Sequence, residues 1–229
     1  ENGWLGYPIS PNYCGLASSG CFQIFEQGFI YWSPSSGAQA VSINFRDAWL
    51  VHSVENGWMG YPASKKFCGL VNSGCFQIFQ GGFLFSSPTS GTHAVRPEVR
   101  TLWQQFDLEY GPLGYPTSDP SNNTNNYTQT FQGGTITVTN GIAKLTATSD
   151  PWMSALISND WLGSKKLNKV CGLKDNGCWQ LFQNGAIYSS TATGVHTVTN
   201  TVGGLWASFG AETGFLGYPT TDPSNNTNT

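Results

Sequence analysis

The segment Trp4-Leu5-Gly6-Tyr7-Pro8 decides the fold, because it returns along the chain at nearly constant intervals. Its copies are Trp58-Met59-Gly60-Tyr61-Pro62, Pro112-Leu113-Gly114-Tyr115-Pro116, Trp161-Leu162-Gly163-Ser164-Lys165 and Phe215-Leu216-Gly217-Tyr218-Pro219. The central glycines are 54, 54, 49 and 54 residues apart. Self-similarity at a fixed period of roughly 20–50 residues is the signature of a repeat protein. The chain therefore contains four units and the opening of a fifth.

The motif also sets the boundaries of the repeats. We expect repeat 1 at residues 4–57, repeat 2 at 58–111, repeat 3 at 112–160, repeat 4 at 161–214 and the start of a fifth repeat at 215–229. Repeat 3 is shorter than the others and has no cysteine. Residues 222–227 copy the sequence of residues 119–124, so we expect the native protein to continue beyond this stretch.

Each unit predicts a β-hairpin, a short further strand and a short helix. In the first unit, residues 22–25 are the expected first strand of the hairpin. In the fourth unit, the Asn184-Gly185 turn is a strong hairpin signal. A helix follows, because apolar residues lie three and four positions apart and Pro97 and Pro151 suit a first helical turn. Each predicted helix carries a tryptophan that we expect in the core. These are Trp49, Trp103, Trp152 and Trp206.

The predicted fold is an α+β tandem repeat. A lone hairpin is marginally stable and must bury one face on a neighbour. Units of about 54 residues that cannot bury that face alone stack on one another, as in repeat proteins generally. We therefore expect the units to pack as a propeller-like ring or a solenoid.

Six cysteines fall in three pairs with identical spacing. A zinc site is disfavoured, because the gap within a pair exceeds the usual ligand spacing and no further ligands lie near enough in the sequence. We expect no metal and three local disulfides, which indicate an oxidising compartment. The expected pairs are Cys14–Cys21, Cys68–Cys75 and Cys171–Cys178.

The composition narrows the choice of partner. Only 10% of residues are charged and the net charge is -3, so no basic field attracts nucleic acid or an anionic membrane. No stretch reaches the roughly twenty apolar residues of a membrane span. Aromatic residues make up 14% of a chain otherwise rich in small polar residues. That mixture suits a neutral, polar and flat-faced partner such as a polysaccharide.

The Leu-Gly-Tyr-Pro turns, the period and the Phe-Gln-Gly-Gly of residues 131–134 resemble the LGFP repeat family. The resemblance covers essentially the whole chain. It implies a secreted, cell-wall-associated protein of actinobacterial type, whose repeats anchor it to a wall polysaccharide such as arabinogalactan. The sequence departs from the family pattern where Tyr replaces the motif Phe, where cysteine pairs are present, and where the fourth turn reads Gly163-Ser164-Lys165.

No catalytic constellation is recognisable, and we expect neither an enzyme nor a cofactor. The three histidines are His52, His93 and His196, and the last two hold equivalent places in different units. No nucleophile elbow, zinc-protease helix or phosphate-binding loop is present. Any chemistry of a parent protein should lie outside this stretch.

One face of the hairpins is the candidate ligand-binding surface. Strand residues alternate between faces, and one face is apolar in every unit, which predicts that it points to the core. The opposite face carries four threonines in repeat 3 and mostly aromatic residues elsewhere, which favours an exposed interaction site. The alternative is that the cysteine loops fold over this face and bury it. The candidate residues are Phe22, Phe29, Tyr31, Phe76, Phe83, Phe85, Trp179 and Tyr188.

Two functions follow from these features. The first is a non-catalytic extracellular module that binds cell-wall polysaccharide or anchors a protein to the envelope. The alternative is a self-assembling extracellular structural protein, such as a filament or surface-layer subunit. In that case the incomplete fifth repeat would be completed by another copy of the chain.

Overall fold

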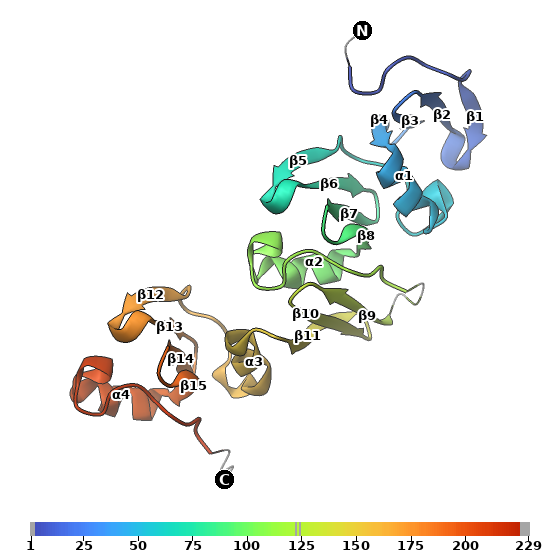
Figure 1. The fold of residues 1–229 in the computed structure, drawn as a ribbon. Helices are drawn as coiled ribbons and strands as arrows, with labels where there is room; N and C mark the ends of the chain where they lie inside the picture. The colour runs from blue at the N-terminus through green and yellow to red at the C-terminus, as the bar shows by residue number, and fades with distance from the viewer. Residues whose placement is uncertain (1–2, 122, 124, 225–229) are drawn as a thin grey trace. The chain divides into compact units, whose positions relative to one another are not determined.

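The computed structural model describes residues 3–121, 123 and 125–224, so the last part of the fifth repeat lies outside it (Figure 1). The chain divides into two compact units, Glu1–Thr146 and Ala147–Thr229. The predicted tandem-repeat architecture is confirmed at this level: within the described residues the strands form four antiparallel sheets, and a short helix follows each sheet in the chain.

The elements repeat in the same order. Repeat 1 contains β1 (Tyr13–Leu16), β2 (Gly20–Phe25), β3 (Gly28–Ser33), β4 (Gly37–Ser42) and α1 (Ile43–Leu50). Repeat 2 contains β5 (Phe67–Leu70), β6 (Gly74–Phe79), β7 (Gly82–Ser87), β8 (Gly91–Val95) and α2 (Pro97–Gln104). Repeat 3 contains β9 (Asn126–Phe131), β10 (Gly134–Thr139), β11 (Ile142–Thr148) and α3 (Pro151–Ser158). Repeat 4 contains β12 (Val170–Leu173), β13 (Gly177–Leu181), β14 (Gly185–Ser190), β15 (Gly194–Thr199) and α4 (Asn200–Ser208).

Short 3-10 helices connect these elements. Three lie inside the cysteine loops: η1 (Ala17–Ser19), η3 (Val71–Ser73) and η6 (Lys174–Asn176). Four follow the α-helices: η2 (Val54–Asn56), η4 (Leu108–Tyr110), η5 (Asp160–Leu162) and η7 (Ala211–Thr213).

The three predicted disulfides are present, and each lies across an antiparallel strand pair. Cys14 is the register partner of Cys21 in the pairing of β1 with β2, and the other two pairs repeat this arrangement. Repeats 1, 2 and 4 therefore have four-stranded sheets, whereas repeat 3, which lacks cysteines, has three strands. The first strand of the cysteine repeats was not expected, because it is four residues long and contains a glycine at a bulge.

The core lies between successive repeats. The helix α1 contacts β3 and β4 of its own repeat and β7 and β8 of the next. Trp49 carries this contact: its ring centroid lies 4.7 Å from that of Tyr31 and 5.2 Å from that of Phe79. Trp103 repeats the arrangement between its own sheet and the hairpin of repeat 3. All four predicted core tryptophans are buried.

The tryptophan of repeat 3 does not occupy the equivalent position. Trp49 and Trp206 are the seventh residues of their helices, whereas Trp152 is the second residue of α3. The shortening of repeat 3 falls between the start of this helix and the next motif, so counting back from the motif glycine gave the wrong helical position. Trp152 is buried through other contacts, with its indole nitrogen donating to Gln180 Oε1 at 3.0 Å.

The motif tyrosine of repeat 2, of repeat 3 and of the fifth motif bonds to the cysteine loop of the repeat before it, and we call this contact the tyrosine clasp. The hydroxyl of Tyr61 donates to the carbonyl of Ala17 at 2.6 Å. Tyr115 and Tyr218 donate in the same way to Val71 and Lys174 at 2.7 and 2.6 Å. Burial raises the pKa of Tyr115 to about 12, so this hydroxyl remains a hydrogen-bond donor at neutral pH.

The clasp requires glycine at the first position of the second strand. A Cβ atom at Gly20, Gly74 or Gly177 would collide with the hydroxyl of the clasping tyrosine. Repeat 3 has Asn126 at this position and no cysteine loop, and the motif of repeat 4 has Ser164 in place of tyrosine. The two partners of the clasp are therefore lost together, which explains why the fourth motif departs from the pattern.

Candidate functional site

At two of the candidate positions the predicted hairpin face is covered by the helix of the same repeat. Tyr31 and Phe85 are both buried, because Trp49 and Trp103 lie edge-on against them at 4.7 and 4.8 Å. The expectation of an open face therefore does not hold at these two positions. The sequence predicted the helix, but it did not predict which face of the sheet the helix covers.

The other candidates on this face are partly exposed. Phe29 and Phe83 lie beneath arginine side chains of the covering helices, with Arg46 and Arg100 at 5.1 and 4.7 Å from the ring centroids. Tyr188 lies edge-on against Trp206. The remaining candidates lie in the second strand of each four-stranded sheet, between the edge strand and the ring of the third strand; they are Phe22, Phe76 and Trp179. A ligand-binding role for these residues stays a prediction.

The structure brings some of the candidates together in an aromatic ladder, a row of rings stacked across the strands of one sheet. In repeat 1 the ladder runs Tyr13, Phe22, Tyr31, with centroids 5.2 and 5.5 Å apart. In repeat 2 it runs through three phenylalanines at 5.1 and 5.6 Å, namely Phe67, Phe76 and Phe85. Repeat 4 keeps two rings, because Val170 takes the outer place.

The outer ring of each complete ladder is the accessible one. Tyr13 is 45% exposed and Phe67 is 38% exposed. Each belongs to an edge strand, so one face of the ring contacts the next rung and the other turns away from the ladder. The residue that follows each ring is a disulfide-bonded cysteine, so the strand that carries it is held in place.

The sequence interpretation missed these two outer residues. The signal was present, since an aromatic residue directly precedes the first cysteine in Tyr13-Cys14 and in Phe67-Cys68. It was overlooked because β1 and β5 were not predicted as strands, and only a third strand places these rings beside the hairpin.

The surroundings of the outer rings are polar and carry little charge. Asn12 donates from Nδ2 to Cys14 Sγ at 3.4 Å, close to Tyr13 in the chain. Lys65 Nζ lies 5.6 Å from the centroid of Phe67. An exposed aromatic ring with a fixed orientation can stack against the apolar face of a neutral ligand. The neighbouring amide of Asn12 and ammonium group of Lys65 are hydrogen-bond donors that suit such a ligand.

The histidines serve structural contacts. His52 Nε2 and His93 Nδ1 each lie 3.2 Å from a carboxylate oxygen of Asp119, which also accepts from the amide of Ala94 at 2.8 Å. Burial raises the pKa of the Asp119 carboxyl, but the hydrogen bonds from both histidines and the amide outweigh it and hold that pKa well below its ordinary value. The hydrogen bond with Asp119 raises the pKa of His93.

Repeat 4 has the same arrangement with the fifth motif. The carboxylate of Asp222 accepts from the amide of Thr197 at 2.7 Å and lies 3.7 Å from His196 Nδ1. His93 and His196 thus each pair with the aspartate of the next motif loop. Among the described residues, no group of three or more His, Cys, Asp or Glu side chains could hold a metal ion.

These features define a tandem-repeat module in which an aspartate and a tyrosine of one motif bond to the repeat before it. Within the described part of the chain, no helix is long and apolar enough to cross a membrane. The chain belongs to the LGFP repeat family: the family's sequence model matches residues 5–57, 59–111 and 162–214.

Other comparisons add little. No curated protein matches the chain. Among solved structures, the chain is similar to a streptogramin B lyase structure at 13% sequence identity, with 82% of this chain covered and a TM-score of 0.17. The match covers 53% of the other chain, so this chain spans about half the length of that structure. A TM-score this low supports no conclusion about fold or function.

Proposed function

We propose that the chain is a non-catalytic extracellular module that binds a neutral cell-wall polysaccharide through the outer rings of its aromatic ladders. The observation that carries the proposal is the pair of exposed, stacked rings Tyr13 and Phe67, each beside a disulfide. Aromatic faces that are open to solvent in a folded protein commonly mark interaction sites.

The chemistry of the chain favours a sugar ligand over a charged one. With 10% charged residues, the surface offers little to a nucleic acid or an anionic lipid. A polysaccharide presents the same sugar many times, so two equivalent platforms in one chain can bind it together and gain affinity through effective concentration. Disulfides in three repeats support an extracellular location.

The proposal includes two further elements. The packing of all units as a propeller-like ring or a solenoid would repeat the binding surface at regular intervals, and it is supported by helices that need the sheet of the next repeat. The non-catalytic assignment is supported by the histidines, whose carboxylate partner also accepts a backbone amide and so holds the repeats together.

The test is binding of the double variant Tyr13→Ala/Phe67→Ala to purified wall polysaccharide, measured by affinity electrophoresis. Each ring should contribute about 1 kcal/mol, so the loss of both should weaken binding by roughly twentyfold to fiftyfold. The matched control is Trp32→Ala, because Trp32 is 41% exposed and neighbours Tyr31 on the strand, hence points to the opposite face of the sheet.

The control should keep wild-type binding. Both variants should remain folded at the temperature of the binding assay, although the double variant loses the stacking contact of each ring with its neighbour. Unchanged binding in the double variant would refute the outer rings as the site.

A further inference from the structure

His93 bridges two segments at the junction of repeats 2 and 3. The residue lies in β8, and each nitrogen of its ring faces an oxygen that accepts hydrogen bonds and cannot donate them. Nε2 lies 2.8 Å from the carbonyl oxygen of Ser90, and Nδ1 lies 3.2 Å from an oxygen of the ionised Asp119 carboxylate. Both nitrogens must carry a proton to make both bonds, and an imidazole with two N–H groups is a cation. The geometry therefore requires a charged His93.

His52 bonds to the same carboxylate in a different way. Its Nε2 lies 3.2 Å from Asp119 Oδ1, but its Nδ1 accepts from the indole nitrogen of Trp58 at 3.4 Å. Because an indole N–H can only donate, Nδ1 of His52 carries no proton, and Nε2 is the nitrogen that donates to Asp119. The hydrogen bonds of His52 therefore do not require a positive charge, whereas those of His93 do.

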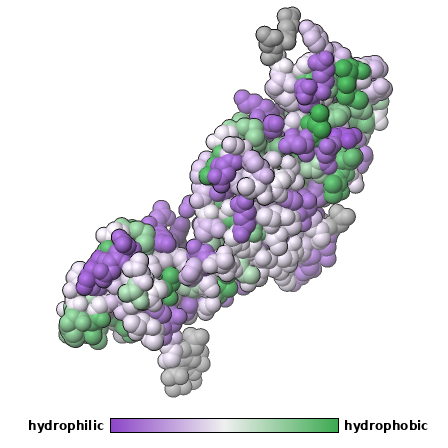
Figure 2. All heavy atoms as spheres, viewed as in Figure 1, coloured by the Kyte–Doolittle hydropathy of each residue, from purple (hydrophilic) through white to green (hydrophobic). Residues whose placement is uncertain are grey.

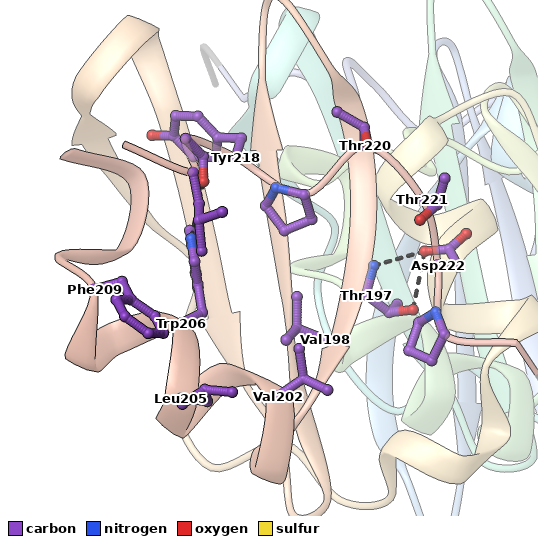
Figure 3. Close-up of a pocket in the computed structure, with 14 residues that line it drawn as sticks. Thr197, Val198, Val202, Leu205, Trp206, Phe209, Tyr218, Thr220, Thr221 and Asp222 are labelled. Carbon is purple, nitrogen blue, oxygen red and sulfur yellow. Dashed lines mark hydrogen bonds between the residues drawn. The ribbon is translucent and has the colours of Figure 1, made fainter. Parts of the chain in front are cut away.

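The same arrangement recurs in repeat 4. His196 holds the equivalent place in β15, with Nε2 2.8 Å from Thr193 O and Nδ1 3.7 Å from the carboxylate of Asp222. Asp222 also accepts two hydrogen bonds from Thr197, which Figure 3 shows as dashed lines. A histidine between a turn carbonyl and the carboxylate of the next motif is thus a feature of two junctions in the chain.

Repeat 1 has Gln39 in the place of His93. Its amide nitrogen donates to Ser36 O at 3.2 Å, which reproduces the bond of the histidine to its turn without a charge. In the next motif Lys65 stands where the following motif has Asp119, so this motif brings no carboxylate to Gln39. Histidine therefore stands opposite aspartate, and glutamine stands opposite lysine, as an ionic histidine–aspartate pair requires. The junction of repeats 1 and 2 is built without this charge.

Loss of a proton from His93 removes one of its two bonds. A neutral ring has one N–H group, so its bare nitrogen would face either Ser90 O or the carboxylate of Asp119. Both sides of this bridge contact repeat 3: Asp119 belongs to it, and Thr89, the neighbour of Ser90, accepts from Gln132 Nε2 at 2.9 Å. Solvent reaches the pair, because the side chains of His93 and Asp119 are 19% and 34% exposed. Deprotonation therefore weakens a contact with repeat 3 whichever bond is lost.

The other ionisable groups at this junction do not take over the role of His93. Arg96 follows β8 and bonds to the motif loop of repeat 3, but arginine keeps its charge throughout this pH range. Tyr127 donates to Glu98 at 2.8 Å, and burial raises the pKa of Tyr127, so it keeps its proton at neutral pH. Charged residues are 10% of the chain, and much of the surface visible in Figure 2 has the pale colours of intermediate hydropathy. Among the described residues of this junction, the residue type that titrates near neutral pH is histidine, and His93 rather than His52 needs its charge.

We propose that the proton on His93 controls the junction of repeats 2 and 3, so that the junction is tight while the ring is charged and loosens as the pH rises and the proton is lost. The hydrogen bond with Asp119 raises the pKa of His93, which agrees in sign: the contribution of the bond is full below about pH 6.5 and is lost as the pH rises through the raised pKa. The junction of repeats 1 and 2, with Gln39 in this place, does not respond to pH in this way. The inference concerns the scaffold and is independent of which ligand the chain binds.

The test is hydrogen exchange of the full chain, followed by nuclear magnetic resonance at about pH 6 and about pH 8.5, below and above the usual titration of histidine. The reporter is the amide of Ala94, which donates to Asp119 Oδ1 at 2.8 Å and exchanges when this bond opens. Its protection factor, corrected for the intrinsic effect of pH on exchange, should fall at least about tenfold, the worth of one charge-assisted hydrogen bond. The control is the amide of Ile78, which donates to Ser64 Oγ of the second motif at 3.0 Å and should keep its protection factor.

His93→Gln is the matched variant, because it installs the side chain that repeat 1 has in this place. Its Ala94 amide should have the same protection factor at both pH values, whereas His52→Gln should keep the wild-type response. The charge is also measured without any variant, from the nitrogen-15 shifts of the His93 ring, which should show two N–H groups at about pH 6. Three results would overturn the proposal: an unchanged Ala94 protection factor in the wild type, the same fall in His93→Gln, or a His93 ring with one bare nitrogen at about pH 6.

Discussion

The tyrosine clasp predicts that Gly74→Ala is costly only while Tyr115 is present. The added methyl group would collide with the Tyr115 hydroxyl and ring. Moving the ring loses a buried hydrogen bond to Val71 O, worth about 1 kcal/mol, and strains a packed interface by about 1–3 kcal/mol. Gly74→Ala should therefore lower the free energy of unfolding by about 2–4 kcal/mol.

The assay is a double-mutant cycle with Tyr115→Ala, followed by urea denaturation and circular dichroism. In the Tyr115→Ala background the collision partner is gone, so Gly74→Ala should cost less than about 1 kcal/mol, and the difference is the coupling energy. Gly204→Ala is the matched control, because this helical glycine has open space around it and alanine should stabilise its helix by about 0.5–1 kcal/mol.

An equal cost of Gly74→Ala in both backgrounds would refute the reasoning, since the tyrosine would then not be what the glycine accommodates. A destabilising Gly204→Ala would show that glycine replacement is harmful here for reasons unrelated to the clasp.

Three further predictions follow from the contacts between and within repeats. Trp103→Ala should lower the free energy of unfolding by about 3–5 kcal/mol in urea denaturation, because it removes a buried ring between two sheets; a loss below about 1 kcal/mol would contradict this. Asp119→Asn should flatten the pH profile of stability. Because the pKa of Asp119 is lowered on folding, its contribution to stability is full above about pH 4 and is lost as the pH falls further. Because the pKa of His93 is raised on folding, its contribution to stability is full below about pH 6.5 and is lost as the pH rises further. The wild-type melting temperature should therefore peak between these two pH values. Replacing Cys68 and Cys75 by serine should cost roughly 2–3 kcal/mol on the chain-entropy estimate, and a melting temperature equal to wild type would contradict it.

Much of the fold could be predicted from the sequence, because a chain with several copies of one unit contains its own comparison. The period, the hairpins and the cysteine pairs depend on local spacing, and the structure confirms them. The position of Trp152 could not be predicted in the same way. Counting from the motif glycine assumes that each unit has its full length, and repeat 3 is shortened between the start of α3 and the next motif.

The candidate site was harder to predict because it depends on which face of a sheet the helix covers. Alternation along β3 identifies two faces of the strand. An aromatic residue such as Tyr31 suits both a ligand-binding surface and a packing contact, and in the structure it packs against Trp49. Threonines on the same face of repeat 3 predicted an exposed face, and in that repeat Thr128 and Thr130 are exposed. Thr128 and Thr137 lie 3.3 Å apart, hydroxyl to hydroxyl, in a sheet of three strands. The threonines therefore did not indicate how the aromatic face of the other repeats is covered.

The central claim, that the outer rings of the ladders contact a neutral polysaccharide, is tested most directly by nuclear magnetic resonance. A soluble oligosaccharide from the wall polysaccharide is titrated into the full chain while the ring protons of Tyr13, Phe67 and Trp32 are followed. We predict saturable shifts at Tyr13 and Phe67 and none at Trp32. Two results would contradict the claim. One is shifts confined to other residues; the other is no shift at all with a sugar from a polysaccharide that retards the chain in affinity electrophoresis.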